Sequence, residues 1–344
     1  MNKVGFTVYY RGMKKYIVTT TINGITPAIE KFDNMPGWNL IVIGDNKTPK
    51  DYKLENGRYV SPEEQKTLKF ESVKMIPWNL IQRRNIGYLL ALEAGADIIA
   101  TIDDDNIPYD NWDKSNEITR EMKEVLCRSA KLVLDPVHGR YTGTHLDIWH
   151  RGFPVQLLED RNNITFGPDR NCVDVVAGMW NGDPDVDAIA RIAAQGLDLR
   201  FTKVNTRIAV GTFSPFNTQN TFLSRRAAMC MCLPFDIGRM DDIWASYMTQ
   251  KVMWSCKSAV VYTEPTVYQD RNIHDLTKDL EKEMIGYKHT LEFITHLKEL
   301  ELNEADDVLD KYMAVVDHVA KLPFVSETMT KFQKAWIKDI RKFK

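Results

Sequence analysis

Between residues 15 and 105, apolar residues follow two alternating patterns: short β-branched runs, and longer segments with apolar residues at helical spacing. The short runs predict strands and the longer segments predict helices. Strands and helices in alternation favour an α/β fold with a parallel, doubly wound sheet, whose ligands bind at the carboxyl ends of the strands. The predicted strands are 15–23, 38–45, 58–60 and 97–102, and the predicted helices are 26–32, 61–68 and 79–96.

The rest of the chain follows other patterns. From about residue 110 to 270 the sequence is irregular and rich in Gly, Pro, Asn and Trp. Beyond residue 275 it becomes amphipathic, and it predicts helices over 276–300, 303–321 and 325–342. We therefore predict an α/β domain over 1–275 and a C-terminal helical region, 276–344, packed on it.

The composition is that of an ordinary soluble globular protein. Of the 344 residues, 44% are hydrophobic and 27% are charged, and the formal net charge of -2 indicates no global basic surface for nucleic acid. The locally basic segment 331–344 is either a solvated helix or a docking patch, and we favour the solvated helix. The five cysteines are scattered without CxxC spacing, which favours neither a disulfide framework nor a zinc site. Because neither a signal-peptide pattern nor a membrane-spanning run is evident, we expect a cytoplasmic protein.

Three consecutive carboxylates follow the strand predicted at 97–102, in the sequence DIIATIDDDNIP. Because side chains alternate along a strand, we expect Asp103 and Asp105 to share one face while Asp104 points elsewhere. Two such carboxylates suit Mg²⁺ or Mn²⁺, which prefer one or two carboxylates together with phosphate oxygens. The alternative is an acidic turn that caps a helix, but the apolar run before the triplet favours the metal site.

A second acid pair, Asp241 and Asp242, opens another predicted helix. The helix dipole stabilises carboxylates at an N-terminus, so capping accounts for one of the two. The other is free to act as a general base or to bind a hydroxyl, and Asp242 is our candidate, with capping as an equal alternative. His274, in a polar segment downstream, is a candidate third metal ligand or an ordinary surface histidine.

Among the basic residues, Arg83 and Arg84 lie on the helix predicted before the acidic strand. Guanidinium groups are planar, permanent donors of the kind that a diphosphate requires. Neighbours on a helix point in different directions, so we expect at least one of the two on a solvated face. Arg151 is expected to meet either a phosphate or a carboxylate from its own loop.

Several segments resemble two plant families in the same order along the chain. RRNIGYLLAL, RGFPV, GMWNGDPDVD, FNTQNTFLSRRA and GRMDDIWASYM resemble the reversibly glycosylated polypeptides, which are UDP-arabinopyranose mutases. IVIGDNKTPKDY, FSPFNTQNTF and TVYQDRNIHDLTKDLEKEM are more similar to the STELLO glycosyltransferase-like proteins. Together these segments cover about residues 15 to 290.

Both resemblances imply a GT-A fold, a nucleotide-sugar site and an Asp-rich metal motif, here Asp103, Asp104 and Asp105. The mutases carry two arginines in the segment that resembles RGFPVQLLED, both tied to self-glycosylation and activity. Arg151 matches the first, whereas Leu158 stands where the second is expected. The resemblance therefore favours a transferase over a mutase.

We accordingly predict a glycosyltransferase that uses Mn²⁺ or Mg²⁺ and moves a sugar from a UDP-sugar, such as a pentose donor, to an acceptor hydroxyl. Asp45 is expected near the base or ribose and Arg84 near the diphosphate. The predicted donor-binding residues are Thr20, Asp45, Arg84, Asp103 and Asp104. The predicted sugar-binding or acceptor-binding residues are Arg151, Asn217, Gln219 and Asn220, although amide-rich loops also satisfy their own backbone.

Three alternatives remain open at this point. The first is a mutase-like or self-glycosylating protein, and the second is a nucleotide-sugar-binding protein without activity. The third concerns the acceptor, which is a glycan, a protein or a modified DNA base, the last of which the net charge does not indicate. The sequence indicates neither the stereochemical outcome nor an oligomeric state.

Overall fold

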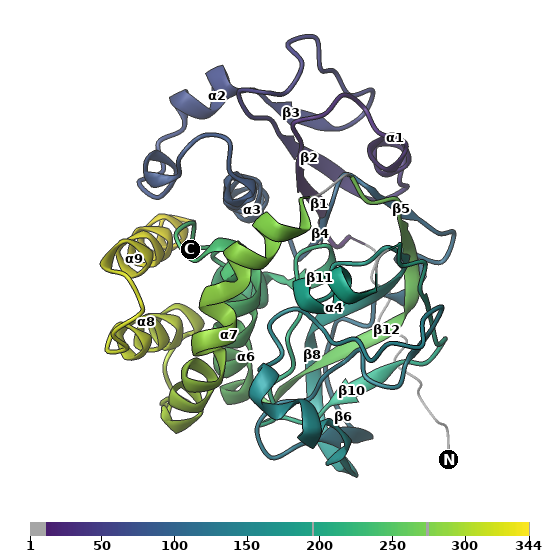
Figure 1. Cartoon of the computed structure of the whole chain (residues 1–344). Coiled ribbons are helices and arrows are strands. Elements are labelled where there is room, and N and C mark those ends of the chain that lie inside the picture. The colour runs from purple at the N-terminus through teal and green to yellow at the C-terminus, as the bar shows by residue number, and fades with distance from the viewer. Residues whose placement is uncertain (1–11, 195, 273–274, 344) are drawn as a thin grey trace, which may run out of the picture.

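Four parallel strands form one half of the central sheet in the computed structural model, which describes residues 12–194, 196–272 and 275–343 (Figure 1). Their spatial order places the first strand of the chain beside the strand that precedes the acid triplet. All four were predicted from their apolar runs. In spatial order they are β3 (Arg58–Val60), β2 (Asn39–Ile43), β1 (Lys15–Thr20) and β4 (Ile98–Ile102).

The connecting helices begin where their capping residues predict. Thr26 Oγ1 accepts a hydrogen bond from the amide of Ile29 at 3.2 Å. Ser61 Oγ does the same for Glu64 at 3.2 Å, so both cap-and-proline signals are confirmed. The three helices are α1 (Pro27–Asp33), α2 (Pro62–Thr67) and α3 (Arg84–Glu93).

Helix α3 packs closely on the parallel strands. A methyl group at Gly87 would lie 2.4 Å from Cγ1 of Val18 on β1, so only glycine allows this approach. The residues of α3 from Arg84 to Leu92 are all buried. Arg84, the first residue of α3, is therefore buried, and it lies at the edge of the sheet where the parallel strands end.

The other half of the sheet is mixed in direction, and within the described residues the whole sheet has ten strands. Strand β11 runs antiparallel to both β4 and β8, and β8 runs parallel to β12. The predicted parallel order thus applies to the N-terminal half, and the fold as a whole is consistent with a GT-A-like α/β architecture. The remaining strands are β5 (Asn106–Pro108), β6 (Thr119–Ser129), β8 (Thr165–Gly182), β10 (Thr206–Ile208), β11 (Asn220–Ser224) and β12 (Ser258–Gln269), with a separate pair β7 (Tyr141–Thr142) and β9 (Arg200–Phe201).

The predicted C-terminal helices are present and lie together on one side of the molecule (Figure 1). They pack against helix α6, whose residues from Asp241 to Met253 are all buried. Within the described residues no helix is long and apolar enough to cross a membrane. The helices are α4 (Ala188–Ala193), α5 (Arg225–Cys230), α6 (Asp241–Ser255), α7 (Leu276–Glu299), α8 (Val308–Val319) and α9 (Glu327–Arg341). Short 3₁₀ turns span Val73–Met75, Ile81–Arg83, Asp113–Ser115, Val155–Asn162 and Gly238–Met240.

The basic residues of α9 do not form an open cationic surface. Those that the structure describes pair with carboxylates on α9 itself, on α8 or just before the Val73–Met75 turn. These pairs agree with the interpretation of residues 331–344 as a solvated helix and not as a docking patch. The pairs are Lys331 with Glu327, Lys334 with Asp317, Lys338 with Glu71, Arg341 with Asp310, and Lys342 with Asp339.

Asp339 ties α9 to the N-terminal half of the chain. Its carboxylate accepts hydrogen bonds from the amides of Glu71 and Ser72 at 3.0 and 2.8 Å. The variant Asp339→Ala leaves the buried amide and hydroxyl of Ser72, and the amide of Glu71, without this acceptor, so we expect the free energy of unfolding in urea to fall by about 2–3 kcal/mol. The matched variant Asp317→Ala removes a half-exposed partner of Lys334 and is expected to cost less than about 0.5 kcal/mol. Equal losses in the two variants would contradict this assignment.

Candidate functional site

A polar cleft of about 650 Å³ opens at the carboxyl ends of β1 and β4. This is the edge at which an α/β sheet is expected to bind ligands. Both predicted acid clusters, at 103–105 and 241–242, line it although they are far apart in the sequence. The described lining is Thr20, Ile22, Asn79, Leu80, Ile81, Gln82, Arg84, Asp103, Asp104, Asp105, Arg151, Asp185, Thr218, Gln219, Leu233, Phe235, Gly238, Arg239, Asp241, Asp242, Gln269, Arg271, Asn272 and Lys282.

The acid triplet forms a turn between β4 and β5 and is not the end of a strand. Strand β4 ends at Ile102, and the amide of Asn106 donates to the carbonyl of Asp103 at 3.2 Å. The premise of alternating side chains was therefore wrong for these three residues. Asp104 is nevertheless set apart, because its carboxylate accepts from Thr21 Oγ1 at 2.5 Å and from Asn23 Nδ2 at 3.0 Å.

The other two carboxylates of the triplet, Asp103 and Asp105, also line the cleft. Asp103 Oδ1 lies 2.6 Å from Arg84 Nη2. Among the described residues the Asp105 carboxylate accepts only long hydrogen bonds, at 3.4 Å from Gln269 Nε2 and at 3.3 and 3.5 Å from the amide and Nδ2 of Asn272. Burial, reinforced by repulsion from Asp103, raises the pKa of Asp105 to about 7. Burial also raises the pKa of Asp103, against the attraction of Arg84.

This pair fits a divalent cation, because the two carboxylates are hard oxygen ligands whose pKa values stay raised in spite of the charges of Arg84 and Arg271. Within the described residues no group of three or more His, Cys, Asp or Glu side chains could hold a metal by itself. Substrate oxygens or water would therefore complete the coordination, as is usual for Mg²⁺. His274, predicted as a third ligand, lies outside the described residues.

Neither arginine of the Arg83–Arg84 pair lies on a solvated face, contrary to the helical-wheel expectation. Arg83 packs 3.5 Å over the ring of Trp78 and donates to Gln65 and to the carbonyl of Ile76. Arg84 is 1% exposed and donates to Thr218 Oγ1 and its carbonyl as well as to Asp103. Arg84 thus orients Asp103 at the cleft with a guanidinium group that is largely committed to protein acceptors.

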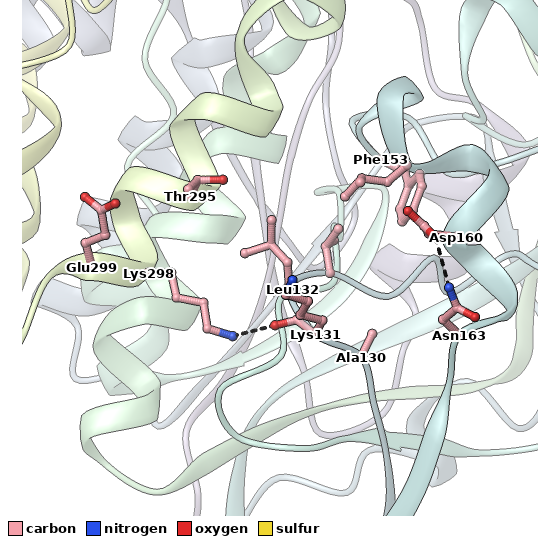
Figure 2. Close-up of a pocket in the computed structure, with 11 residues that line it drawn as sticks. Ala130, Lys131, Leu132, Phe153, Asp160, Asn163, Thr295, Lys298 and Glu299 are labelled. Carbon is pink, nitrogen blue, oxygen red and sulfur yellow. Dashed lines mark hydrogen bonds between the residues drawn. The ribbon is translucent and has the colours of Figure 1, made fainter.

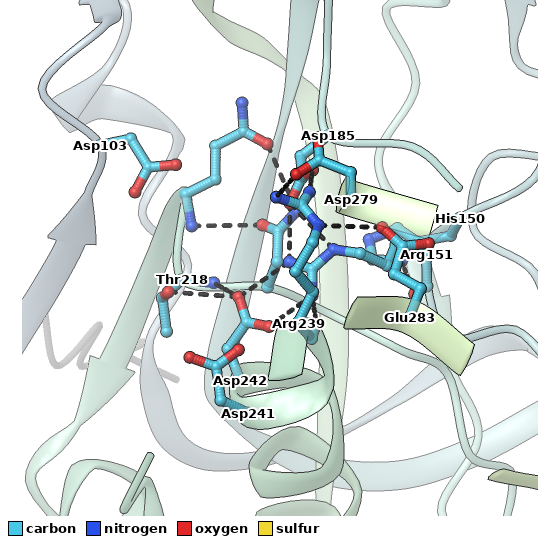
Figure 3. Close-up of polar contacts among 12 residues, drawn as sticks. Asp103, His150, Arg151, Asp185, Thr218, Arg239, Asp241, Asp242, Asp279 and Glu283 are labelled. Atoms are coloured by element: carbon cyan, nitrogen blue, oxygen red, sulfur yellow. Dashed lines mark hydrogen bonds and ion pairs between the residues drawn. The ribbon is translucent and has the colours of Figure 1, made fainter. Parts of the chain in front are cut away.

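The second acid pair divides differently from the prediction. Both oxygens of Asp242 are engaged, by Arg151 at 3.0 and 3.2 Å and by the amide and hydroxyl of Thr218 at 2.9 and 3.2 Å (Figure 3). Asp241 instead accepts from Gln82 Nε2 at 2.7 Å. Burial, with the charge of Asp242, raises the pKa of Asp241 to about 7. Neither side chain caps α6, and because Asp242 is fully engaged by Arg151 and Thr218, Asp241 is the more available carboxyl group of the two.

Arg151 pairs with carboxylates from other segments and not from its own loop. Its guanidinium group lies 2.6 Å from Asp185 Oδ2 and 3.0 Å from Asp242 Oδ1. Figure 3 shows the three side chains together. Asp185 also pairs with Arg239 and, at 3.0 Å, with Arg271. Although burial raises the pKa of Asp185, the three guanidinium groups outweigh that effect and hold it well below its usual range.

Sequence reasoning missed Asp185, Arg239, Arg271 and Gln82 as cleft residues. The first two lie in GMWNGDPDVD and GRMDDIWASYM, segments that the resemblance had singled out, and Arg271 lies in YQDRN. Their place in these segments did not predict which residues they contact, because their partners lie far away in the sequence.

The remaining predicted residues fall into two groups. Thr20 and Gln219 line the cleft, where Gln219 Nε2 donates to Asn106 Oδ1 at 3.2 Å. The other three are buried behind the lining and bond protein groups. Asn217 Nδ2 donates to Gln219, Asn220 joins Trp112 to Thr266, and Asp45 accepts from the amides of Asn46 and Asn79.

A second cavity, of about 730 Å³, lies between the segment 130–133, the Val155–Asn162 turn and α7 (Figure 2). Leu132, Phe153 and Leu157 contribute apolar walls. Lys298 Nζ donates to the carbonyl of Lys131 at 2.9 Å, and Asp160 accepts from Asn163 at 2.9 Å. Because Lys298 and Asp160 are engaged with the protein and no carboxylate cluster lines this cavity in the described residues, we place the chemistry in the acid-lined cleft.

Behind the cleft wall, one phenol hydroxyl serves two buried carboxylates. Tyr287 Oη lies 3.0 Å from Asp187 Oδ1 and 3.0 Å from Glu283 Oε2. A phenol has one proton, so it can donate to only one of them at a time. Burial, with the charge of Glu283, raises the pKa of Asp187 to about 7.

This arrangement predicts a pH-dependent stability. In the folded protein Asp187 keeps its proton up to about pH 7, whereas in the unfolded chain it releases that proton above its ordinary pKa of 3.8. The protonated carboxyl group therefore contributes stability at low pH, and this contribution is lost as the pH rises through about 7. Relative to Asp187→Asn, which has no proton to lose, the wild-type free energy of unfolding should fall by about 3 kcal/mol from about pH 4 to about pH 7. Urea titrations across this range test the prediction, and parallel curves for the two proteins would contradict it.

Comparison with known proteins identifies two relatives. No protein-family model matches the chain. It is 24% identical over 349 aligned positions to "Probable glycosyltransferase STELLO1" of Arabidopsis thaliana, and equally to "Probable glycosyltransferase STELLO2" of the same plant. Each alignment covers 95% of this chain and 44% of the relative, so the chain spans less than half the length of the proteins it matches. The resemblance to the STELLO family is therefore distant but extends over nearly the whole chain.

Proposed function

We propose that this chain is a metal-dependent glycosyltransferase that moves a sugar from a UDP-sugar to an acceptor hydroxyl. The observation that carries the proposal is the meeting of two acid clusters in one cleft, the turn 103–105 and the pair 241–242. One cluster has the charge and oxygen ligands for a cation, and the other has a buried carboxyl group with a pKa of about 7. The names of the STELLO relatives support the same reaction class.

On the donor side, Asp103 and Asp105 would hold Mn²⁺ or Mg²⁺. Such a cation supplies positive charge that stabilises the diphosphate leaving group. Arg84 orients Asp103, and Arg271 adds positive charge beside Asp105. Thr20 and Gln219 are placed to contact the donor from the strand ends. Asp45, predicted near the base or ribose, would contribute there indirectly. Its carboxylate accepts a hydrogen bond from the amide of Asn79, and Asn79 lines the cleft.

On the acceptor side, Asp241 takes the proton of the acceptor hydroxyl. The acceptor oxygen forms a bond to the anomeric carbon while the bond from that carbon to the diphosphate breaks, and the UDP leaves as an anion. A base with a pKa near the working pH is suited to this transfer, because it is ionised yet still basic. Arg151 and Asp242 pair with each other in the wall of the same cleft.

A thermal-shift screen of UDP-, GDP- and dTDP-sugars, each with and without Mn²⁺, tests the proposal. We expect UDP-sugars to raise the melting temperature only in the presence of Mn²⁺, by several degrees at saturating ligand. No shift with any donor would overturn the proposal, and a shift without metal would remove its metal-dependent part.

Product analysis separates the alternative functions. If the UDP-sugar that raises the melting temperature is hydrolysed with release of UDP, the protein is a transferase that uses water as the acceptor. If that UDP-sugar binds without release of UDP, the protein is a nucleotide-sugar-binding protein. Conversion of UDP-arabinopyranose to its furanose form would identify a mutase. Salt-dependent binding to DNA would indicate a nucleic-acid acceptor.

A further inference from the structure

Three consecutive residues connect the two acid clusters of the cleft. Gln82 donates to Asp241, Arg84 donates to Asp103, and Arg83 between them is packed under Trp78. This short segment therefore has one hydrogen-bonding contact on the donor side and one on the acceptor side. The contact of Arg84 orients Asp103, one of the proposed metal ligands. The contact of Gln82 with Asp241 has not yet been given a role in the proposed reaction.

Gln82 is a buried glutamine that uses only one end of its side-chain amide for hydrogen bonding in the described structure. The side chain is 6% exposed, its Nε2 donates to Asp241 Oδ2 at 2.7 Å, and its Oε1 is buried without a hydrogen-bond partner in the described structure. A buried amide oxygen without a partner is destabilising, and such groups are rare in folded proteins. The unpaired oxygen follows from the Asp241 contact, because an ionised carboxylate accepts only from the NH₂ end of the amide.

The backbone around Gln82 is fixed independently. Asn85 Nδ2 donates to the carbonyls of Gln82 and Leu233, each at 2.8 Å, and Asn85 Oδ1 accepts from the amide of Leu233 at 2.9 Å. Asn85 thus joins the Ile81–Arg83 turn to the loop before α6. The Gln82 side chain is not needed to hold these elements together.

We infer that Gln82 is a positioning residue that holds one oxygen of Asp241 and directs the other toward the acceptor. The inference rests on the proposed function, in which Asp241 is the base. Loss of the amide donor removes a hydrogen bond that favours the ionised carboxylate, so Asp241 becomes harder to ionise. The other charged groups that act on Asp241 are Asp242, on its own helix, and Arg151, from the cleft wall; Arg239 and Lys282 line the same cleft.

The first measurement is the titration of Asp241 itself. Carboxyl signals of protein labelled with ¹³C-aspartate are followed against pH, and the Asp241 signal is identified by its loss in Asp241→Asn. In Gln82→Leu we expect the midpoint to rise by about one pH unit or more. The matched control is Gln333→Leu. Gln333, on α9 and outside the cleft, is also a buried glutamine whose Oε1 has no hydrogen-bond partner among the described residues. Its substitution should leave the Asp241 midpoint unchanged.

The second measurement is the hydrolysis of the UDP-sugar that stabilises the protein, followed as UDP release. We expect Gln82→Leu to lower kcat at least about tenfold with the donor KM changed less than about twofold, and to move the acid limb of the pH profile upward. The isosteric variant Gln82→Glu should keep activity where its carboxyl group is protonated and can still donate, and lose it at higher pH. This variant also serves if Gln82→Leu does not fold.

The outcomes separate the two ideas. An unchanged Asp241 titration in Gln82→Leu, or in Gln82→Glu if only that variant folds, overturns the positioning role. Absence of UDP release from the wild-type protein overturns the proposed transfer reaction, and the titration then decides alone whether Gln82 controls Asp241. A shifted titration with unchanged kcat would show that Asp241 is not the base.

Discussion

Replacement of Asp105 by asparagine is expected to abolish the stabilisation that Mn²⁺ and a UDP-sugar together confer on the protein. Within the described part of the chain the side chain makes only long hydrogen bonds, to Gln269 and Asn272, so little hydrogen-bonding stabilisation is lost with it. Its charge is buried beside Asp103, and burial with this repulsion raises its pKa to about 7. Removing the charge should therefore raise the free energy of unfolding of the ligand-free protein at pH 8, by about 1–3 kcal/mol. Donor affinity in the presence of Mn²⁺ should fall at least about 100-fold.

The informative control is Asp104→Asn, in the same turn. Asp104 bonds Thr21 and Asn23, so its loss should lower the melting temperature of the ligand-free protein while leaving most of the Mn²⁺-dependent response to the donor. Thermal-shift titrations of both variants distinguish the two roles. If Asp104→Asn loses the response and Asp105→Asn keeps it, the assignment of the metal ligands is reversed.

Replacement of Arg151 by methionine is expected to destabilise the whole protein by about 3–5 kcal/mol, measured by urea unfolding at pH 7. Arg151 is 4% exposed and lies between Asp185 and Asp242. Asp185 retains Arg239 and Arg271, but Asp242 loses the cation that it contacts and becomes a buried, uncompensated charge. Because Asp242 also accepts from Thr218, which in turn accepts from Arg84, the floor of the cleft should shift and donor binding should be lost.

The matched control is Arg200→Met. Arg200 pairs with Asp198 in a half-exposed ion pair, so its loss should cost less than about 1 kcal/mol and should not affect donor binding. A second variant, Asp242→Asn in the Arg151→Met background, should recover part of the lost stability, because it removes the charge that Arg151 no longer compensates. No recovery would show that Arg151 acts through contacts other than this pair.

These expectations change the interpretation of Arg151. In the mutase resemblance its counterpart is tied to activity, and the sequence predicts that Arg151 meets a phosphate, a carboxylate from its own loop, or the sugar or acceptor. Its guanidinium group is instead engaged by two carboxylates and by the carbonyl of Arg239. Loss of activity on its substitution would therefore follow from loss of structure, and a parallel fall in stability and donor binding would distinguish this cause from a direct contact.

Local patterns predicted the elements around the cleft well because each element is specified by neighbours in sequence. The cap of α1 at Thr26 and the buried run of β4 need no distant partner. The alternation argument failed at Asp103 because the strand ends one residue earlier and a turn begins. The helical-wheel argument failed at Arg83 because Trp78 covers it.

The sequence by itself determined the parallel strands, the helices between them and the presence of two acid clusters, because these depend on the local order of apolar, capping and charged residues. Only the tertiary structure decided which carboxylate is available for which chemistry. Asp242 is occupied by Arg151, 91 positions away, and Asp241 is held by Gln82, 159 positions away. The ionisation of a buried carboxyl group depends on such partners and on its burial, and both are established only when distant segments of the chain meet.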